Sequence, residues 1–391
     1  MLTKWLVRLL AAACLLVARP VAVPAAEEAL RIGLIVPLTG GQASTGKQLA
    51  NAVRLYMSEN GDTVAGRKIE VLVRDDGAVP ENTRRIAQEL IVNDRVGIIA
   101  GFGITPAALA AAPLATQART PEIVMLAGAS VVTERSPYIV RTSFTLAQSS
   151  VIIGDWAAKS GIRRVATMTT DYAPGNDALE FFKTHFVAGG GQIVEEVKVP
   201  LVNPDFAPFL QRMKDAKPDA LFVFVPGGQG GNFMKQFSER GLDNSGIRVI
   251  GPGDVMDDDL LNNMGDAALG TVTAHMYSAA HRSPRNEAFV AAYRKMFDSR
   301  PGFVAVGGYD GIHLIYLALK KTGGNSSGET LVEAMKGLAW ESPRGPVSID
   351  PDTRDIVQNI YIRRVERVDG ELYNVEFATF EAVKDPGKGS K

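Results

Sequence analysis

The sequence has few of the side chains that disulfides and metal sites need. Its 391 residues include a single cysteine, Cys14, so neither an intrachain disulfide nor a cysteine-based metal cage can form. Only four histidines are present, and no two have the H-x-x-x-H spacing of a helical metal site. We therefore expect no metal ion and no cofactor.

An excess of one charge is also missing. The 42 Lys and Arg residues are balanced by 43 Asp and Glu residues, which leaves a formal net charge of -1. Such a chain is not drawn electrostatically to nucleic acid or to an anionic membrane. Its composition is that of a globular protein rather than a disordered one. At roughly 150 residues per domain, its length predicts two or three domains.

An apolar run lies near the N-terminus. Two basic residues precede an apolar stretch from Leu9 to Ala18, and small residues follow it. This pattern predicts a signal peptide over residues 1–26, cleaved after Ala25 or Ala26. The stretch is too short to cross a bilayer core of about 30 Å comfortably. A cysteine-free mature chain suits the bacterial periplasm. A lipoprotein signal and a buried helix are the alternatives.

The remainder alternates short apolar strands with amphipathic helices. This rhythm predicts parallel, doubly wound sheets, and the sequence holds enough strands for two of them, divided near residues 141–144. The fold class is therefore α/β with two lobes. From residue 345 onward, the alternation of apolar and polar residues favours antiparallel or edge strands. The strands that we expect lie at residues 31–37, 68–73, 96–100, 123–126, 138–140, 164–168, 193–199, 220–225 and 248–250.

Five loops rich in Gly, Ser and Thr follow these strands. Ligands of open parallel sheets bind outside the carboxyl ends of the strands, where helix N-termini offer free N–H groups. The hydroxyl of Thr105 could bind a carboxylate there or merely cap its helix. The loops lie at residues 39–46, 101–105, 128–130, 172–176 and 226–231, and their candidate ligand residues are Ser44, Thr45, Gly103, Thr105, Gly128, Ser130, Tyr172 and Gly227.

Other chemistry has little support. Gly41 to Lys47 matches a phosphate-binding loop, but Gln48 stands where that loop needs Ser or Thr. The run Asp257 to Asp259 could suggest a metal, and we interpret it as acids at a helix start. The sequence has no G-x-S-x-G elbow and no thiol after the leader. These absences favour a binding protein over an enzyme.

Several segments together resemble the type I periplasmic solute-binding proteins of branched-chain amino acid ABC importers. They are RIGLIVPLTGGQASTGKQLANAVRLYMSENG, TPEIVMLAGASVVTERSPYIVRTSFT, TDYAPGNDALEFF, KPDALFVFVPGGQGGNFMKQF, GYDGIHLIYLAL and SPRGPVSIDP. The resemblance covers nearly all of residues 30–380. It implies two lobes joined by three crossovers that close on a ligand. These crossovers would fall near residues 141–144, 274–278 and 340–344.

The same resemblance implies the division of the chain and its partners. It places the ligand carboxylate on Thr105, Gly128 and Ser130, and a further contact near Thr45. The partners would be a small carboxylate and the membrane permease subunits of an importer, with the binding protein itself a monomer. The expected units are a signal peptide at 1–26, an N-terminal lobe at 27–142 plus 275–340, a C-terminal lobe at 143–274 plus 341–380, and a flexible tail at 381–391.

One departure from the family pattern concerns the ligand. Amino-acid binders of this family carry an acid for the ligand ammonium, but Gly253 occupies that position here and Asp254 follows it. We expect Asp254 to face outward, with Phe102, Tyr172 and Tyr277 around an aromatic carboxylate. If Asp254 faces the cleft instead, the resemblance favours an amino acid. A ligand-sensing module and an enzyme of the same fold remain further alternatives.

Overall fold

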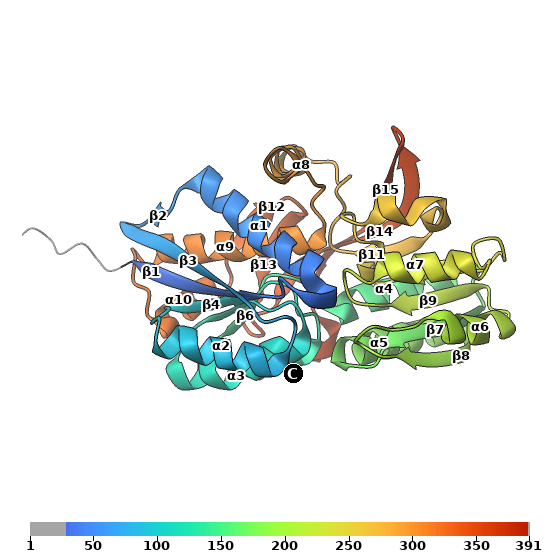
Figure 1. Ribbon diagram of the computed structural model, residues 1–391, viewed down its shortest axis with the longest axis horizontal. Helices are drawn as coiled ribbons and strands as arrows, with labels where there is room; N and C mark the ends of the chain where they lie inside the picture. Colours follow the sequence, from blue (N-terminus) through green and yellow to red (C-terminus); the bar gives the residue numbers. More distant parts are fainter. Residues whose placement is uncertain (1–28, 390–391) are drawn as a thin grey trace, which may run out of the picture.

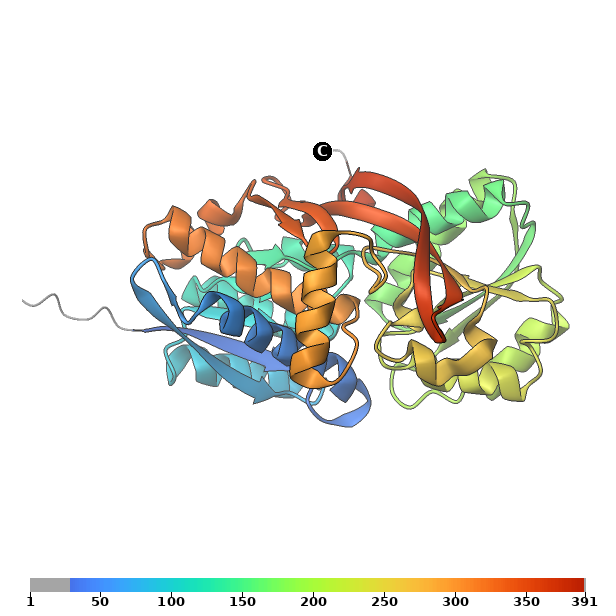
Figure 2. The ribbon, with the colours of Figure 1, turned by 90° about the horizontal axis from the view of Figure 1, so that it is seen from above.

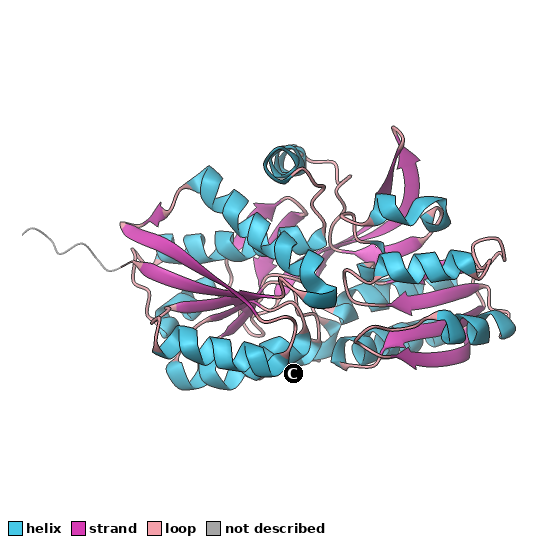
Figure 3. Cartoon of the chain, in the orientation of Figure 1, coloured by secondary structure: helices cyan, strands magenta, loops and turns pink. Residues whose placement is uncertain are grey.

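The computed structural model describes residues 29–389, which form two lobes side by side (Figure 1). The expected leader and its cleavage site lie outside the described residues. Within residues 29–389, no helix is long and apolar enough to cross a membrane. The secondary structure alternates strands and helices along most of the chain, as the sequence predicts (Figure 3).

The first lobe is built on a six-stranded sheet. Its order is β2-β3-β1-β4-β5-β6, and every pairing except that of β2 is parallel. Apart from Arg31, the central strand LRIGLIV is apolar, because helices cover both of its faces. The strands are β1 (Leu30–Val36), β2 (Thr63–Val64), β3 (Arg67–Asp75), β4 (Ile98–Gly101), β5 (Glu122–Val124) and β6 (Ile139–Arg141).

Helices from two distant parts of the sequence cover this sheet. The helices α2 and α3 lie on one face, and α1 packs with α9 on the other (Figure 1). The chain therefore returns to the first lobe after building most of the second. The helices are α1 (Ala43–Asn60), α2 (Pro80–Val92), α3 (Thr105–Ala118), α8 (Pro284–Phe297), α9 (Phe303–Lys321) and α10 (Gly328–Met335).

The second lobe is built on a nine-stranded mixed sheet. Its order is β12-β13-β14-β11-β10-β9-β7-β8, with β15 also paired to β14. The strands from β8 to β11 are parallel, and those from β14 onward are antiparallel, as the alternating tail predicts. The strands are β7 (Arg164–Thr170), β8 (Gln192–Val199), β9 (Ala220–Phe224), β10 (Arg248–Gly251), β11 (Val272–His275), β12 (Ala339–Ser342), β13 (Gly345–Ile349), β14 (Ile356–Val368) and β15 (Glu371–Val383).

Four helices and several short 3-10 turns complete this lobe and the loops between the lobes. The helices are α4 (Leu146–Lys159), α5 (Ala173–Ala188), α6 (Ala207–Asp215) and α7 (Gly230–Glu239). The 3-10 turns are Gly40–Gln42, Ser130–Glu134, Asp254–Met256, Leu261–Ala268 and Pro386–Lys388.

Buried ion pairs fix the chain where it passes between the lobes. The chain crosses between β6 and α4, between β11 and α8, and near β12 (Figure 2). The Arg141 guanidinium lies 2.8 Å from the Asp355 carboxylate, and Arg344 lies 2.8 Å from Asp310. All four side chains are almost completely buried. The crossing strands are thus held by charges that have no access to water.

The C-terminal tail is docked, which makes the prediction of a flexible tail from residue 381 wrong up to Lys388. Strand β15 continues to Val383. The Asp385 carboxylate then accepts hydrogen bonds from the hydroxyls of Ser130 at 2.9 Å and Thr145 at 3.1 Å. The Lys388 ammonium donates to the carbonyl of Ser130. The tail polar groups are therefore matched to partners far away in sequence, a pairing that local composition does not reveal.

Candidate ligand site between the lobes

A small cavity lies between the lobes at the carboxyl ends of the parallel strands. Loops after β4 and β5 contribute from the first lobe, and loops after β7, β9 and β10 contribute from the second. This is the edge at which open parallel sheets bind ligands. The residues that line the cavity are Gln42, Gly103, Ile104, Thr105, Leu126, Ala127, Gly128, Phe144, Leu146, Tyr172, Pro174, Phe224, Pro226, Gly227 and Asp254.

The first lobe presents neutral hydrogen-bond donors. Thr105 is the first residue of α3, and its hydroxyl accepts a bond from the N–H of Ala129 at 3.3 Å. That bond uses the hydroxyl as an acceptor and leaves its proton available to a ligand. Pro106 has no N–H, and the N–H of Ala107 donates to the carbonyl of Ile104 at 3.1 Å, so Thr105 is the residue of this helix start that can donate to a ligand. The lining contains no Lys or Arg, so an anion would be held here by neutral donors and the dipole of α3.

Aromatic rings form much of the wall. Tyr172 stacks on Phe224 with ring centroids 6.1 Å apart and planes 17° from parallel. Phe144, at the first crossover, meets Phe303 edge to face at 5.6 Å. Leu126 and Leu146 add aliphatic surface. A flat apolar ring with a polar substituent suits this combination of walls and donors.

The second lobe contributes Asp254, which lines the cavity and is 5% exposed. The prediction that Asp254 faces outward is therefore wrong. Gly253 has φ +95°, and a Cβ there would lie 2.5 Å from His275 Cδ2 and from the Arg363 guanidinium. The family position for an acid is thus closed to any side chain. The turn made by Gly253 brings the next residue, Asp254, to the cavity instead.

The electrostatics of this end follow from burial. Burial raises the pKa of the Asp254 carboxyl well above its ordinary range, and the nearby charge of Asp257 adds to the effect. Arg363 acts in the opposite direction. Burial, with Arg363 and Arg344 nearby, holds the pKa of His275 well below its ordinary value. The imidazole is therefore neutral at pH 7, and its Nε2 lies 3.6 Å from Asp254 Oδ2.

The structure brings some of the predicted site residues together and leaves others outside the lining. Those that line the cavity are Gly103, Thr105, Gly128, Tyr172, Gly227 and Asp254, and those outside its lining are Ser44, Thr45, Phe102, Ser130 and Tyr277.

The residues outside the lining have partners elsewhere. The Ser130 hydroxyl donates to Asp385, and the Tyr277 hydroxyl donates to Asn286 at 2.9 Å. Phe102 is buried in the core that packs α2 and α3 against the sheet. The Thr45 hydroxyl donates to the carbonyl of Gln42 at 2.6 Å, so it supports a loop that does reach the cavity.

Sequence reasoning missed several lining residues. Phe144, Leu146 and Phe224 stand in or beside apolar runs, and such residues cannot be told from core residues by pattern alone. Gln42 gave a weak signal as a polar residue in a loop already singled out. His275, which lies beside Asp254 but outside the lining, gave no signal, because it ends a strand with no neighbouring residue of matching chemistry.

Acidic residues that follow the turn at Asp254–Met256 connect the two lobes. The Gln48 amide on α1 donates to Asp257 at 3.0 Å and accepts from the N–H of Gly302 at 3.0 Å. The Ser44 hydroxyl donates to Asp259 at 2.7 Å. The interpretation of Asp257 to Asp259 as acids at a helix start is therefore wrong, since the turn at Leu261–Ala268 has no acid in its first turn and both Asp257 and Asp259 bind α1 of the opposite lobe. Among the residues described, no cluster of His, Cys, Asp or Glu could hold a metal ion.

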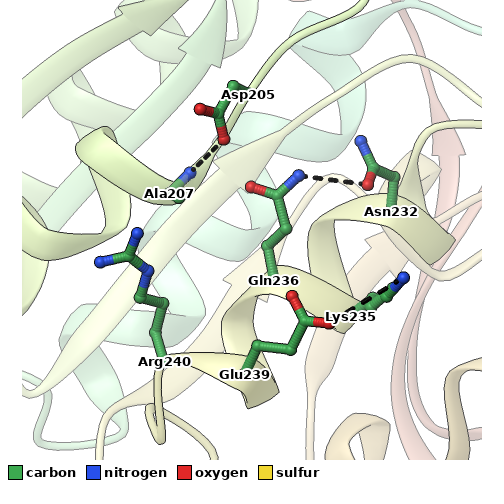
Figure 4. A pocket seen from close by; sticks show the side chains of 7 residues that line it. All are labelled: Asp205, Ala207, Asn232, Lys235, Gln236, Glu239 and Arg240. Carbon is green, nitrogen blue, oxygen red and sulfur yellow. Dashed lines mark hydrogen bonds and ion pairs between the residues drawn. The ribbon is translucent and has the colours of Figure 1, made fainter.

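A second hollow lies on the surface between α6 and α7 (Figure 4). Its polar side chains are largely paired with one another. Asp205 accepts from the N–H of Ala207 at 3.1 Å, and Gln236 donates to Asn232 at 3.2 Å. The hollow therefore offers a ligand few free groups, in contrast to the cavity between the lobes.

The chain matches known proteins along most of its length. A family model described as periplasmic binding protein matches residues 29–371. The Leu/Ile/Val-binding protein homolog 6 of Brucella abortus (strain 2308) is 42% identical over 365 residues, covering 92% of this chain and 94% of the relative.

The chain belongs to the periplasmic binding protein family.

Two solved structures agree with this membership. A solute-binding protein of an ABC transporter from Rhodopseudomonas palustris BisB5, in complex with 3,4-dihydroxybenzoic acid, is 78% identical with a TM-score of 0.92. One from Rhodopseudomonas palustris HaA2, in complex with p-hydroxybenzoic acid, is 40% identical with a TM-score of 0.89. Each match covers 92% of this chain and 99% of the chain in the solved structure. The protein is thus a periplasmic solute-binding protein of an ABC transporter, a class whose task is binding rather than catalysis.

Replacing Thr105 with Val tests the donor at the start of α3. The change removes the hydroxyl and keeps the side-chain volume, so the helix should still form. If the hydroxyl donates to a charged ligand, the binding free energy should weaken by about 1.5–3 kcal/mol. Calorimetric titration of both proteins measures the difference. Unchanged affinity in a folded variant would remove Thr105 from the site.

Proposed function

We propose that this solute-binding protein captures an aromatic carboxylate between its lobes and delivers it to the permease subunits of an importer. The observation that carries the proposal is the cavity itself, in which neutral donors of the first lobe face aromatic walls. A carboxylate is suited to the donors and the helix dipole, and a ring is suited to the walls. The bound ligands of the two Rhodopseudomonas palustris relatives support the same class.

The residues that we assign to the carboxylate are Thr105 and the backbone around Gly128. Both line the cavity from the first lobe. A Cβ at Gly128 would lie 2.5 Å from Leu146 Cδ2, so only glycine lets the loop approach this closely. Burying the ring contributes about 25 cal/mol per Å² of apolar surface removed from water. Domain closure then brings Tyr172 and Phe224 of the second lobe onto the ring.

An amino acid is the second candidate, because Asp254 lines the cavity. An ionised Asp254 could pair with a ligand ammonium. Its raised pKa counts against this pairing, since the carboxyl would first have to lose its proton in a buried place. Binding of an amino acid would therefore have to offset the cost of ionising this buried carboxyl, whereas an aromatic acid already ionised in solution would bind without that step.

A thermal-shift screen separates the two candidates. A ligand that binds only the folded state raises the melting temperature, by an amount that grows with its concentration relative to Kd. We expect benzoate-type acids to raise it and leucine, isoleucine, valine and phenylalanine to leave it unchanged. The reverse pattern would favour the amino acid. A response to neither class would contradict the proposed ligand.

We further propose that the leader is removed near Ala25 or Ala26 and that the mature protein is a monomer without catalytic activity. The apolar leader followed by small residues supports the first point. The intact mass of protein from a periplasmic extract and its elution volume check them. An uncleaved mass or a dimer would contradict the proposal, as would chemical change of the bound acid.

A further inference from the structure

Two neighbouring buried polar atoms of the second lobe have no hydrogen-bond partner among residues 29–389. They are Oδ2 of Asp254, which lines the cavity, and Nε2 of His275, which lies outside its lining. Their separation of 3.6 Å is too long for a hydrogen bond between them. Buried polar atoms are almost always paired, because leaving one unpaired costs free energy. Because Asp254 also lines the cavity, the pair is placed to bind a polar group of a ligand.

The hydrogen bonds of His275 determine which nitrogen carries its proton. The N–H of Met276 donates to His275 Nδ1 at 2.8 Å, so Nδ1 is an acceptor. A neutral imidazole with an accepting Nδ1 carries its proton on Nε2. Phe144 and Phe303 hold the ring from the sides, with centroids 4.8 Å and 4.4 Å from it. The Nε2–H is therefore a fixed donor beside the Asp254 carboxyl.

The neighbouring cation, the Arg363 guanidinium, already forms hydrogen bonds with other groups. The Arg363 guanidinium donates to the carbonyl of Tyr277 and, at 3.1–3.2 Å, to the Thr273 hydroxyl. Within residues 29–389, Asp254 forms no ion pair with Lys or Arg, and the neutral imidazole of His275 lies 3.6 Å from its Oδ2. A carboxyl in this setting suits a neutral partner that can both donate and accept, and a hydroxyl is such a partner.

We propose that Asp254 and the neighbouring His275 bind a hydroxyl group on the ring of the aromatic ligand, so that the protein selects hydroxylated benzoates over benzoate. The inference rests on the proposed function and names the substrate class of the same cavity. The carboxylate of the ligand lies at the first lobe and its ring hydroxyl at the second. A ligand with both groups therefore contacts both lobes and favours their closure.

Calorimetric titration of the wild-type protein with benzoate, 3-hydroxybenzoate, 4-hydroxybenzoate and 3,4-dihydroxybenzoate tests the proposal. At least one hydroxylated acid should bind about 10-fold or more tightly than benzoate, because a site built for a hydroxyl leaves its polar groups unpaired when the hydroxyl is missing. Equal affinities across the four acids would overturn the proposal and leave the proposed function standing. Binding of none of them would overturn both.

Variants of Asp254 and His275 test which residues cause the preference for hydroxylated acids. Asp254→Ala should weaken the binding of the hydroxylated acids more than that of benzoate, so that the ratio of affinities falls to about 3-fold or less. Asp254→Asn keeps a side chain able to donate and accept, and should retain part of the preference. His275→Phe keeps an aromatic ring between Phe144 and Phe303 and should lower the ratio without weakening benzoate.

Benzoate affinity is the internal control for folding in each variant. An equal loss for benzoate and its hydroxylated forms in Asp254→Ala would show a merely structural role and overturn the proposal. Tight leucine binding that disappears in Asp254→Asn would do the same, since it would show that Asp254 pairs with an ammonium.

Discussion

Replacing Asp310 with Ala should lower the free energy of unfolding by about 3–5 kcal/mol, the usual loss when one partner of a buried ion pair is removed. Asp310 lies on α9 and accepts from Arg344 at 2.8 Å, from the Trp340 indole at 2.9 Å and from the Ser342 hydroxyl at 2.7 Å. The variant would leave the Arg344 charge buried beside its remaining carbonyl partners. The third crossover between the lobes would then lose its main anchor.

Urea unfolding of both proteins measures this effect. An exposed ion pair provides the control, because Arg85 and Glu89 lie 3.4 Å apart with about half of each side chain or more in solvent. Glu89→Ala should change the free energy of unfolding by about 0.5 kcal/mol or less. If Asp310→Ala cost no more than this control, the buried pair would not hold the crossover.

The second large effect concerns Asp257 and pH. Burial raises the pKa of Asp257 to about 8, and the charges of Asp259 and Asp258 nearby add to it. An aspartate in the unfolded chain titrates near pH ~3.9. Between these values the folded state binds a proton that the unfolded state does not. Stability should therefore fall as pH rises through this window, with a slope of up to about 1.4 kcal/mol per pH unit.

Asp257→Asn should flatten this dependence and stabilise the protein at pH 8. The asparagine oxygen can still accept from the Gln48 amide, so the contact between the lobes is kept. Unfolding free energies at pH 5, 6.5 and 8 for both proteins measure the difference, which should grow toward pH 8. Asp243→Asn, an exposed position, should leave the wild-type profile unchanged. Parallel profiles for wild type and Asp257→Asn would contradict the assignment.

The fold followed closely from the sequence because its signals are repeated. Continuous apolar strands such as LRIGLIV, separated by amphipathic helices, have few solutions other than a parallel sheet covered on both faces. The same strand pattern predicted some of the residues that line the cavity. Parallel strands bring their carboxyl ends to one edge, so that loops far apart in sequence place Thr105, Gly128, Tyr172 and Gly227 together.

The rest of the site depends on contacts that no local pattern encodes. The direction of Asp254 is set by the positive φ of Gly253 and by the bulk of His275 behind it. The Ser130 hydroxyl is taken by Asp385, which lies 255 residues away in sequence. Phe144 and Phe224 line the cavity, but they lie in or beside apolar stretches of sequence that are equally typical of core residues. The sequence favours an aromatic carboxylate because Gly253 stands at the family position for an acid and aromatic residues flank the loops. The structure places Asp254 at the cavity, and the aromatic wall formed by Tyr172 and Phe224 favours the same class of ligand.

Calorimetric titration of the purified protein at pH 7 with 3,4-dihydroxybenzoate, and separately with leucine, tests whether the cavity binds an aromatic carboxylate or an amino acid. We expect a single site for the aromatic acid with a Kd of about 1 µM or tighter, which corresponds to about -8.2 kcal/mol, and no heat of binding for leucine. Tight binding of leucine with none of 3,4-dihydroxybenzoate would contradict it.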